Sequence, residues 1–128
     1  MILLDTAYLV ALVRKNDANH ERADELAKGF EEKTIISGWV FSETANYLIR
    51  KDGSTKVLPV LRHIRASDAI FVAPSDEDIK PALDLIEKYD HLSFTDASNV
   101  IVMQRLNIKK IASFDSDFDR VIGVQRIF

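Results

Sequence analysis

The sequence predicts a single α/β domain in which helices surround a central parallel sheet. Short apolar runs alternate with longer segments whose apolar residues recur at helical spacing, along the whole chain of 128 residues. Strands that are separated by helices pair in parallel through right-handed crossovers. The length suits one domain with its own core, and no repeat, low-complexity tract or linker divides it. Residues 1–128 are therefore expected to form one domain.

Five short apolar runs are expected to form the strands. Pro74 stops the third run, whereas the first run ends at Asp5 and the fourth leads into a segment that contains Asp115. The expected strands span residues 1–4, 33–37, 69–73, 108–112 and 124–128.

Apolar residues at a spacing of three and four predict the intervening helices. Pro59 is expected in the first turn of its helix, where proline is tolerated. Two helices are expected to begin at Ser75 and Ser93, each followed three residues later by an acid in the spacing of a capping box. The expected helices cover residues 6–13, 17–31, 39–51, a segment around 57–64, segments beginning at Ser75 and Ser93, and a short turn at 116–121.

The composition excludes several classes of protein. With 47% hydrophobic and 29% charged residues, the chain is typical of soluble globular proteins. No apolar run approaches the roughly 20 residues that cross a bilayer, and the N-terminus lacks the basic start of a signal peptide, so no membrane association is expected. The absence of cysteine excludes disulfides and thiolate chemistry and fits a cytoplasmic location. A net charge of −3 means that nucleic-acid binding would require a local basic surface.

Four acids are expected at one rim of the sheet. Asp5 and Asp115 follow strands, and Glu43 and Asp96 fall in the opening turns of helices. In parallel α/β sheets, strand C-termini and helix N-termini share a rim, where such folds build their sites. Each acid also has an ordinary explanation: Asp5 and Asp96 can cap helices, Asp115 can open a turn, and Glu43 can be an exposed helical glutamate. Independent capping does not, however, explain an inward glutamate near the other three.

Carboxylates gathered in this way suit a hard divalent cation. Bound Mg²⁺, or Mn²⁺ in its place, prefers oxygen ligands and would relieve the repulsion between the acids. Such an ion also activates water and neutralises charge during phosphodiester hydrolysis. The sequence contains neither a Gly-x-Ser-x-Gly elbow nor a Gly-x-x-x-x-Gly-Lys phosphate loop. It therefore favours a metal-dependent enzyme.

The acids belong to four motifs in a fixed order: Asp5-Thr6, Glu43, Asp96-Ala97 and Ser113-x-Asp115-x-x-Phe118. This ordered set resembles the PIN-domain ribonucleases, in particular the VapC toxins of prokaryotic toxin–antitoxin pairs, over essentially the whole chain. The resemblance implies a three-layer α/β fold whose five-stranded sheet has the order 3-2-1-4-5. It also implies an Mg²⁺-dependent endoribonuclease whose metal-binding catalytic acids are Asp5, Glu43, Asp96 and Asp115, accompanied by the hydroxyls of Thr6 and Ser113.

The same resemblance implies RNA as substrate, a homodimer, and a protein antitoxin whose tail enters the cleft. Apolar helix faces around residues 47–49 and 57–64 are expected to carry more hydrophobic surface than the sheet covers, which favours a dimer. Basic residues near the ends of the early helices could rim the cleft and hold the RNA backbone, although a solvated face is the default for each. They are Arg14, Lys15, Arg50, Lys51, Lys56, Arg62 and Arg65.

The acid-rich segment after the fourth strand departs from the family's pattern, because Asp117 and Asp119 follow Asp115. We expect Asp115 to be a direct metal ligand. Asp117 is expected to hold at most a metal-bound water, and Asp119 to be mainly a solvated acid. Phe118, between them, is expected to pack inward.

The aromatic side chains near the acids are expected mainly in the core, and the histidines are expected on the surface. Trp39 and Phe94 lie close to the acids in sequence and could stack bases, but core packing is favoured, as for Phe118. The three histidines, at positions 20, 63 and 91, are expected on solvated faces rather than as a proton shuttle.

Two other functions stay open. Asp115-x-Asp117 resembles the aspartate pair of Mg²⁺-dependent phosphatases and of Toprim-like enzymes. Haloacid-dehalogenase-type phosphatases place this pair on the first strand, where this chain has Asp5-Thr6-Ala7, and Toprim domains place a glutamate there. Both therefore fit less well. The other alternative is a non-catalytic interaction module whose acids only cap helices.

Overall fold

The computed structural model describes residues 1–128 as an α/β fold built on a five-stranded sheet. All neighbouring strands pair in parallel, and their order, β3-β2-β1-β4-β5, confirms the order implied by the resemblance. The central strand β1 pairs with β2 on one side and β4 on the other. The strands are β1 (Ile2–Leu4), β2 (Thr34–Ser37), β3 (Ile70–Val72), β4 (Lys110–Ala112) and β5 (Gln125–Ile127).

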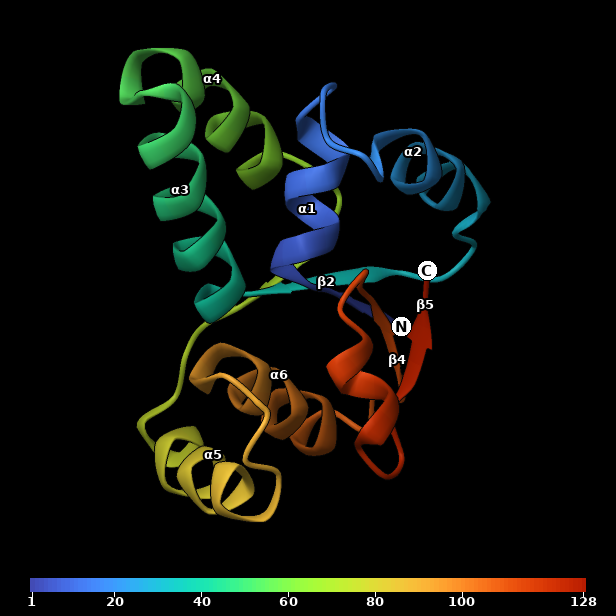
Figure 1. Ribbon diagram of the computed structural model, residues 1–128, viewed down its shortest axis with the longest axis vertical. Helices are drawn as coiled ribbons and strands as arrows, with labels where there is room; N and C mark the ends of the chain where they lie inside the picture. Colours follow the sequence, from blue (N-terminus) through green and yellow to red (C-terminus); the bar gives the residue numbers. More distant parts are fainter.

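Helices cover both faces of the sheet. Figure 1 shows α1 to α4 on one side and α5 and α6 on the other, as right-handed crossovers require when the chain moves first toward β3 and then back to β4. A short 3₁₀ helix, η1 (Ser116–Arg120), precedes the last strand. The α-helices are α1 (Thr6–Val13), α2 (His20–Gly29), α3 (Gly38–Asp52), α4 (Ser54–Arg65), α5 (Asp76–Lys88) and α6 (Phe94–Arg105).

The core is centred on β1. All three residues of this strand are buried, because neighbouring strands flank it and helices cover both of its faces. Tyr8 of α1 is 1% exposed, and its hydroxyl donates to the carbonyl of Ala23 in α2 at 3.2 Å. Strands of three or four residues gain few ladder hydrogen bonds, so packing of apolar side chains stabilises the sheet.

The start of α4 differs from the expectation. The helix begins at Ser54, so Pro59 lies in its second turn rather than its first. Gly53 joins α3 to α4 with a φ of 83°, which glycine adopts without the penalty that a Cβ would bring. The Val57 N–H donates to the Gly53 carbonyl at 3.2 Å, which closes a full turn before the proline.

Only one of the two expected capping boxes forms. Ser93 Oγ accepts from the Asp96 N–H at 3.1 Å, and the Asp96 carboxylate accepts from the Ser93 N–H at 3.2 Å. At the start of α5, Ser75 caps the second helical residue, but Asp78 does not return the bond. Asp78 is 2% exposed and accepts two hydrogen bonds, of 3.0 and 2.9 Å, from Arg105 of α6. The second box was therefore a wrong prediction, because an arginine distant in sequence binds the acid.

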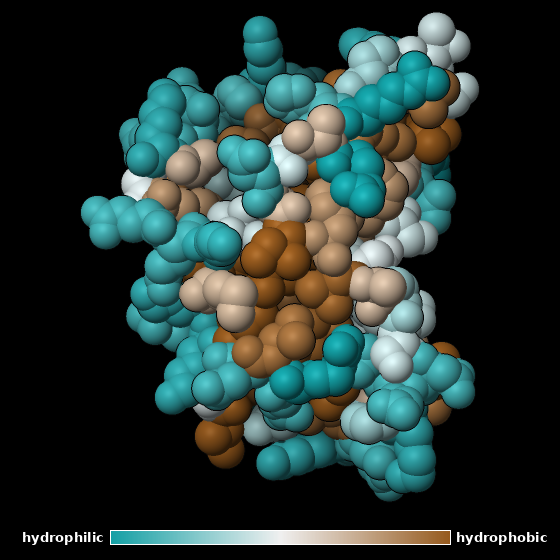
Figure 2. All heavy atoms as spheres, turned by 180° about the vertical axis from the view of Figure 1, so that it is seen from behind, coloured by the Kyte–Doolittle hydropathy of each residue, from teal (hydrophilic) through white to brown (hydrophobic).

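The outer surface includes a broad apolar area. Figure 2 shows hydrophobic side chains gathered across the middle of the face opposite the view of Figure 1, with hydrophilic residues around them. A groove of about 690 Å³, lined mainly by apolar side chains, lies between α1, the end of α2 and the end of α4. No helix combines the length and the apolar character needed to span a membrane.

The helices α3 and α4 expose less apolar surface than expected. Val57, Leu61 and Ile64 of α4 are buried in the core, because this face packs on the sheet and on neighbouring helices. The large apolar side chains that these two helices expose are Ile49, at 38%, and Leu58, at 45%. Only these two side chains remain of the exposed apolar surface that was expected on α3 and α4, and the homodimer stays a prediction.

Candidate functional site

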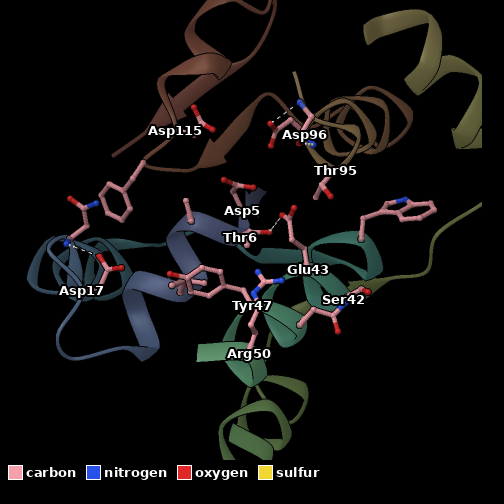
Figure 3. Close-up of a pocket in the computed structure, with 17 residues that line it drawn as sticks. Asp5, Thr6, Asp17, Ser42, Glu43, Tyr47, Arg50, Thr95, Asp96 and Asp115 are labelled. Atoms are coloured by element: carbon pink, nitrogen blue, oxygen red, sulfur yellow. Dashed lines mark hydrogen bonds between the residues drawn. The ribbon is translucent and has the colours of Figure 1, made fainter. Parts of the chain in front are cut away.

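A cleft of about 820 Å³ opens at the carboxyl ends of β1 and β4. Residues from α1, α3, the start of α6 and the segment after β4 line it. Figure 3 shows that the four acids singled out in the sequence surround this one opening. The structure therefore brings Asp5, Glu43, Asp96 and Asp115 together from four separate segments of the chain.

Asp5 is the most deeply buried of the four, with 3% of its surface exposed. It accepts hydrogen bonds from the Ser113 hydroxyl at 2.7 Å and the Asn99 amide at 3.4 Å, and its side chain makes no capping bond to α1. Burial raises the pKa of Asp5 from 3.8 to about 7; the bond from Ser113 lowers it, and the charges of Asp96 and Glu43 raise it. Asp5 therefore lines the cleft and does not cap α1 with its side chain.

A buried polar chain supports Asp5 from below. The Ser37 hydroxyl, at the end of β2, donates to Asn99 Oδ1 at 3.0 Å, and Asn99 Nδ2 donates to Asp5 Oδ1. Ser37 and Asn99 are 1% and 0% exposed, so these bonds fix the Asn99 amide in one orientation. The sequence analysis did not identify Asn99. Its only signal is its position three residues after Asp96, on the same face of α6.

Asp96 caps α6 and also lines the cleft. Its capping explanation is therefore correct, but incomplete, because only Oδ2 takes part in the bond to the Ser93 backbone. Partial burial raises the pKa of Asp96; the bonds from Ser93 lower it, and the charges of Asp115 and Glu43 raise it. Oδ1 makes no hydrogen bond within the protein and remains available as a ligand atom.

Glu43 lies in the second turn of α3 with its side chain exposed in the cleft. It was expected on an inward, apolar helix face, but its carboxylate reaches the cleft, where the Thr6 hydroxyl donates to Oε2 at 2.6 Å. Thr6 thus holds a different acid from its neighbour Asp5. The pair joins the first turn of α1 to α3 across the cleft (Figure 3).

Asp115 follows β4 and is half-buried. Its Oδ1 accepts from the Asp117 N–H at 2.9 Å, so it does open the turn into η1 while also lining the cleft. Its own N–H donates to Ser113 Oγ at 3.0 Å. Because Ser113 also donates to Asp5, one buried hydroxyl links the ends of β1 and β4.

The other two acids of this segment lie outside the cleft lining. Asp117 is half-buried, and its backbone carbonyl is hydrogen-bonded by His91 at 3.1 Å. Asp119 is exposed, as expected of a solvated acid, and it also accepts two hydrogen bonds, of 2.8 and 2.7 Å, from Arg126 of β5. Phe118 is fully buried, as expected.

Comparison with known proteins identifies the fold. The PIN domain family matches residues 2–124, nearly the whole chain. The chain belongs to the PIN-domain family.

Its relatives include VapC proteins of similar length. The 23S rRNA-specific endonuclease VapC20 of Mycobacterium tuberculosis is 30% identical over 121 residues, which cover 92% of each chain. The crystal structure of VapC20, described as a Sarcin-Ricin loop cleaving toxin, matches this PIN domain with a TM-score of 0.86 at 26% identity, over 93% of both chains. A toxin–antitoxin complex from Klebsiella pneumoniae shares the fold at 17% identity, with a TM-score of 0.73 over 98% of this chain and 96% of that one. The resemblance to PIN-domain VapC proteins is thereby confirmed.

The donor set of the PIN-domain cleft fits a hard cation. Its potential ligands are oxygens, since neither histidine nor cysteine lines it. No three acidic or histidine side chains are already arranged around one point, because Asp5, Glu43 and Asp96 hydrogen-bond to neighbouring groups. Binding an ion would exchange some of these bonds for coordination. Mg²⁺ suits such a site because it uses few carboxylates and keeps several waters.

The expected basic rim is largely absent. Of the seven basic residues considered in the sequence, only Arg50 lines the cleft. Arg14 instead pairs with Asp52 at 3.2 Å, and the Arg65 guanidinium lies 4.6 Å from the centroid of the Phe71 ring. Arg14 is thus held by a residue of α3 and Arg65 by a residue of β3, and neither side chain lines the cleft.

The aromatic residues divide between core and cleft. Trp39 and Phe94 are half-buried and pack edge to face at 5.4 Å, with Trp39 also lining the cleft. Tyr47 and Phe114 line the cleft as well and were missed. Tyr47 follows Glu43 by four residues on α3, a helical spacing that could have indicated it.

The histidines differ from their expected placement. His20 and His91 are half-buried and hydrogen-bond to the backbone carbonyls of Ala11, at 2.8 Å, and Asp117. Only His63 is exposed. No histidine lines the cleft, so the geometry gives no support to a histidine proton shuttle.

Proposed function

We propose that this PIN domain is a divalent-metal-dependent endoribonuclease that hydrolyses RNA phosphodiester bonds, with Mg²⁺ as the ion and Mn²⁺ as a substitute. The observation that carries the proposal is the meeting of four carboxylates in one cleft of a fold shared with VapC20. The raised pKa values of Asp5 and Asp96 support it, since a cation would offset their desolvation and mutual repulsion.

The residues of the cleft take distinct roles in this proposal. The four carboxylates hold the ion, which when bound supplies an activated water and neutralises charge on the phosphate. Ser113 orients Asp5 through its hydroxyl and fixes the backbone of Asp115. Thr6 holds Glu43. Asp117 contributes through its backbone N–H to Asp115, and its side chain, which lies outside the cleft lining, would act on a bound ion only through water.

We further propose that the enzyme is the toxin of a toxin–antitoxin pair and forms a homodimer. VapC20 is described as a toxin, and the Klebsiella pneumoniae structure is a toxin–antitoxin complex, which supports a protein antitoxin as partner. A basic side chain of that partner could occupy the carboxylates in place of the ion, because charge-assisted bonds from arginine or lysine satisfy the same oxygens.

The test is cleavage of a mixed-sequence RNA by the purified chain with Mg²⁺, compared with EDTA. Cleavage should need the ion and should be abolished by Asp5→Asn. Asp68→Asn is the matched control, since Asp68 is an exposed aspartate outside the cleft, and it should cleave like the wild type. A folded wild type that leaves every RNA intact would remove the proposal. Turnover of a small phosphomonoester without RNA cleavage would favour the phosphatase alternative.

A further inference from the structure

One positive charge lies among the acids of the cleft. Arg50 is the only lysine or arginine that lines it, whereas its acidic lining residues are Asp5, Asp17, Glu43, Asp96 and Asp115. Arg50 takes part in none of the ion pairs or side-chain hydrogen bonds of the protein. Arg14, Arg105 and Arg126, by contrast, each bind an aspartate. An arginine without a partner beside five acids is therefore available for an anionic ligand.

The position of Arg50 on α3 relates it directly to the carboxylates. Glu43, Tyr47 and Arg50 follow one another at spacings of four and three residues, which puts them on one face of the helix. Their Cα atoms therefore extend over about 10 Å of helix length. Figure 3 shows the Arg50 side chain running along this face, beside Tyr47 and toward Glu43. The wall made by α3 thus carries Glu43 and, from about two turns further along the helix, an unpaired arginine whose guanidinium extends back toward the acids.

We propose that Arg50 binds the backbone phosphate of the nucleotide next to the scissile phosphodiester, with Tyr47 lining the same subsite. The inference rests on the proposed function and names the part of the substrate that α3 holds. A single bound ion compensates the charge of the scissile phosphate, but a neighbouring phosphate would still meet the acids. A planar guanidinium forms bidentate bonds to phosphate and so offsets that repulsion where the strand enters.

The test measures binding and cleavage separately. Binding of a fluorescent mixed-sequence oligoribonucleotide is measured in the Asp96→Asn background, in which cleavage is suppressed, with Mg²⁺ present and over a range of salt concentrations. Arg50→Gln is compared with Arg62→Gln, the matched control, because Arg62 is exposed on α4 outside the cleft. Arg50→Lys retains the charge and tests for rescue. Steady-state cleavage is measured for the same substitutions in the chain with Asp96 intact.

Arg50→Gln should weaken binding about tenfold, as expected for a charge-assisted bond. It should also reduce the slope of log Kd against log salt by about 0.7, the value for one phosphate contact on a single strand. In the cleavage assay, Arg50→Gln should raise KM and leave kcat nearly unchanged. Arg50→Lys should recover most of the RNA binding. Arg62→Gln should bind RNA as tightly as the Asp96→Asn protein without a second substitution.

Equal binding and salt slopes for Arg50→Gln and Arg62→Gln would overturn the inference. A fall in kcat with unchanged Kd would also overturn it, since that pattern places Arg50 on the scissile phosphate. A wild type that binds RNA through Arg50 without cleaving it would instead overturn the proposed function and leave the phosphate subsite standing.

Discussion

Asp5 combines deep burial with acidic neighbours, and it is stabilised by neutral groups rather than by a cation. Its position after the first strand was visible in the sequence, as was the hydroxyl of Ser113. The amide of Asn99 was not identified, because its only signal is a spacing of three residues from Asp96, which does not distinguish a supporting residue from an ordinary core residue. The acids of the cleft could therefore be predicted from the sequence, whereas the hydrogen bonds that support them could not.

Substitution of Asp5 should change how stability depends on pH in EDTA. An unfolded Asp5 ionises near 3.8 and the folded one near 7, so between these values the unfolded state loses its proton first. The wild type should therefore lose stability as pH rises from about 4 to about 7, by a few kcal/mol at about 1.4 kcal/mol per pKa unit. Asp5→Asn should remove this loss. Urea unfolding of both proteins at pH 4.5 and pH 8 measures the difference; parallel pH profiles would contradict it.

Substitutions of the three aspartates after β4 should reduce RNA cleavage to different extents. Asp115→Asn should reduce RNA cleavage by more than the roughly 10–100-fold typical of groups that act behind a ligand, and Asp117→Asn by no more than that. Asp119→Asn should leave cleavage nearly intact but lower the melting temperature, since it leaves Arg126, whose side chain is 8% exposed, without its carboxylate. Cleavage rates and thermal melts of the three variants test this order. A greater loss of cleavage in Asp119→Asn than in Asp115→Asn would reverse the assignment.

The elements follow local signals except where a distant residue competes. Ser93 and Asp96 form the capping box that their spacing predicts. Ser75 and Asp78 have the same spacing, but Arg105 of α6 binds Asp78 instead. Helix α4 begins before its proline because Gly53 allows a direct junction with α3. Such contacts depend on the tertiary fold, which local spacing does not encode.

Gly38→Ala should destabilise the junction between β2 and α3. A Cβ at Gly38 would clash with Cδ of Pro74, in the segment that leaves β3, so one of the two backbones must shift. A cost of about 1–3 kcal/mol is expected for such overpacking. Gly29→Ala is the control, because no atom lies within 4 Å of its added Cβ, and it should be neutral or slightly stabilising. The free energies of unfolding in urea test the pair; equal values would show that Pro74 yields freely.

For the whole molecule, the strand order could be predicted because the ordered acid motifs resemble the PIN-domain family, whose sheet has this order. The pattern of strands and helices by itself predicted only that the four acids share one rim of a parallel sheet. The basic rim could not, since Arg14 and Arg65 are held by neighbours that only the folded chain provides. The sequence also does not show which apolar residues reach the surface, where they could form a dimer contact. The apolar face of α4 lies mostly in the core, and only Ile49 of α3 and Leu58 of α4 remain as large exposed apolar side chains on these two helices.

We expect the chain to sediment as a dimer at tens of micromolar, on the order of weak-dimer affinities, and Leu58→Glu to convert it to a monomer. A charge placed within an apolar contact would remain desolvated without a partner, which weakens association. Ile122→Glu is the control, because Ile122 is 82% exposed and lies far along the chain, before β5. Sedimentation velocity distinguishes the outcomes. A monomeric wild type, or dissociation by both substitutions alike, would contradict the prediction.

The pKa of about 7 that burial gives Asp5 means that the metal-free protein stores a proton in its cleft at neutral pH. A cation that coordinates this carboxylate must displace whatever part of this proton is bound at the working pH. The heat of Mg²⁺ binding should therefore contain the ionisation heat of whichever buffer takes up the proton. Calorimetric titrations in Hepes and in Tris, two buffers with different heats of ionisation, should give different apparent enthalpies, and the difference should vanish near pH 9. The cleft would then bind its ion more tightly with each step toward alkaline pH, until Asp5 is fully ionised.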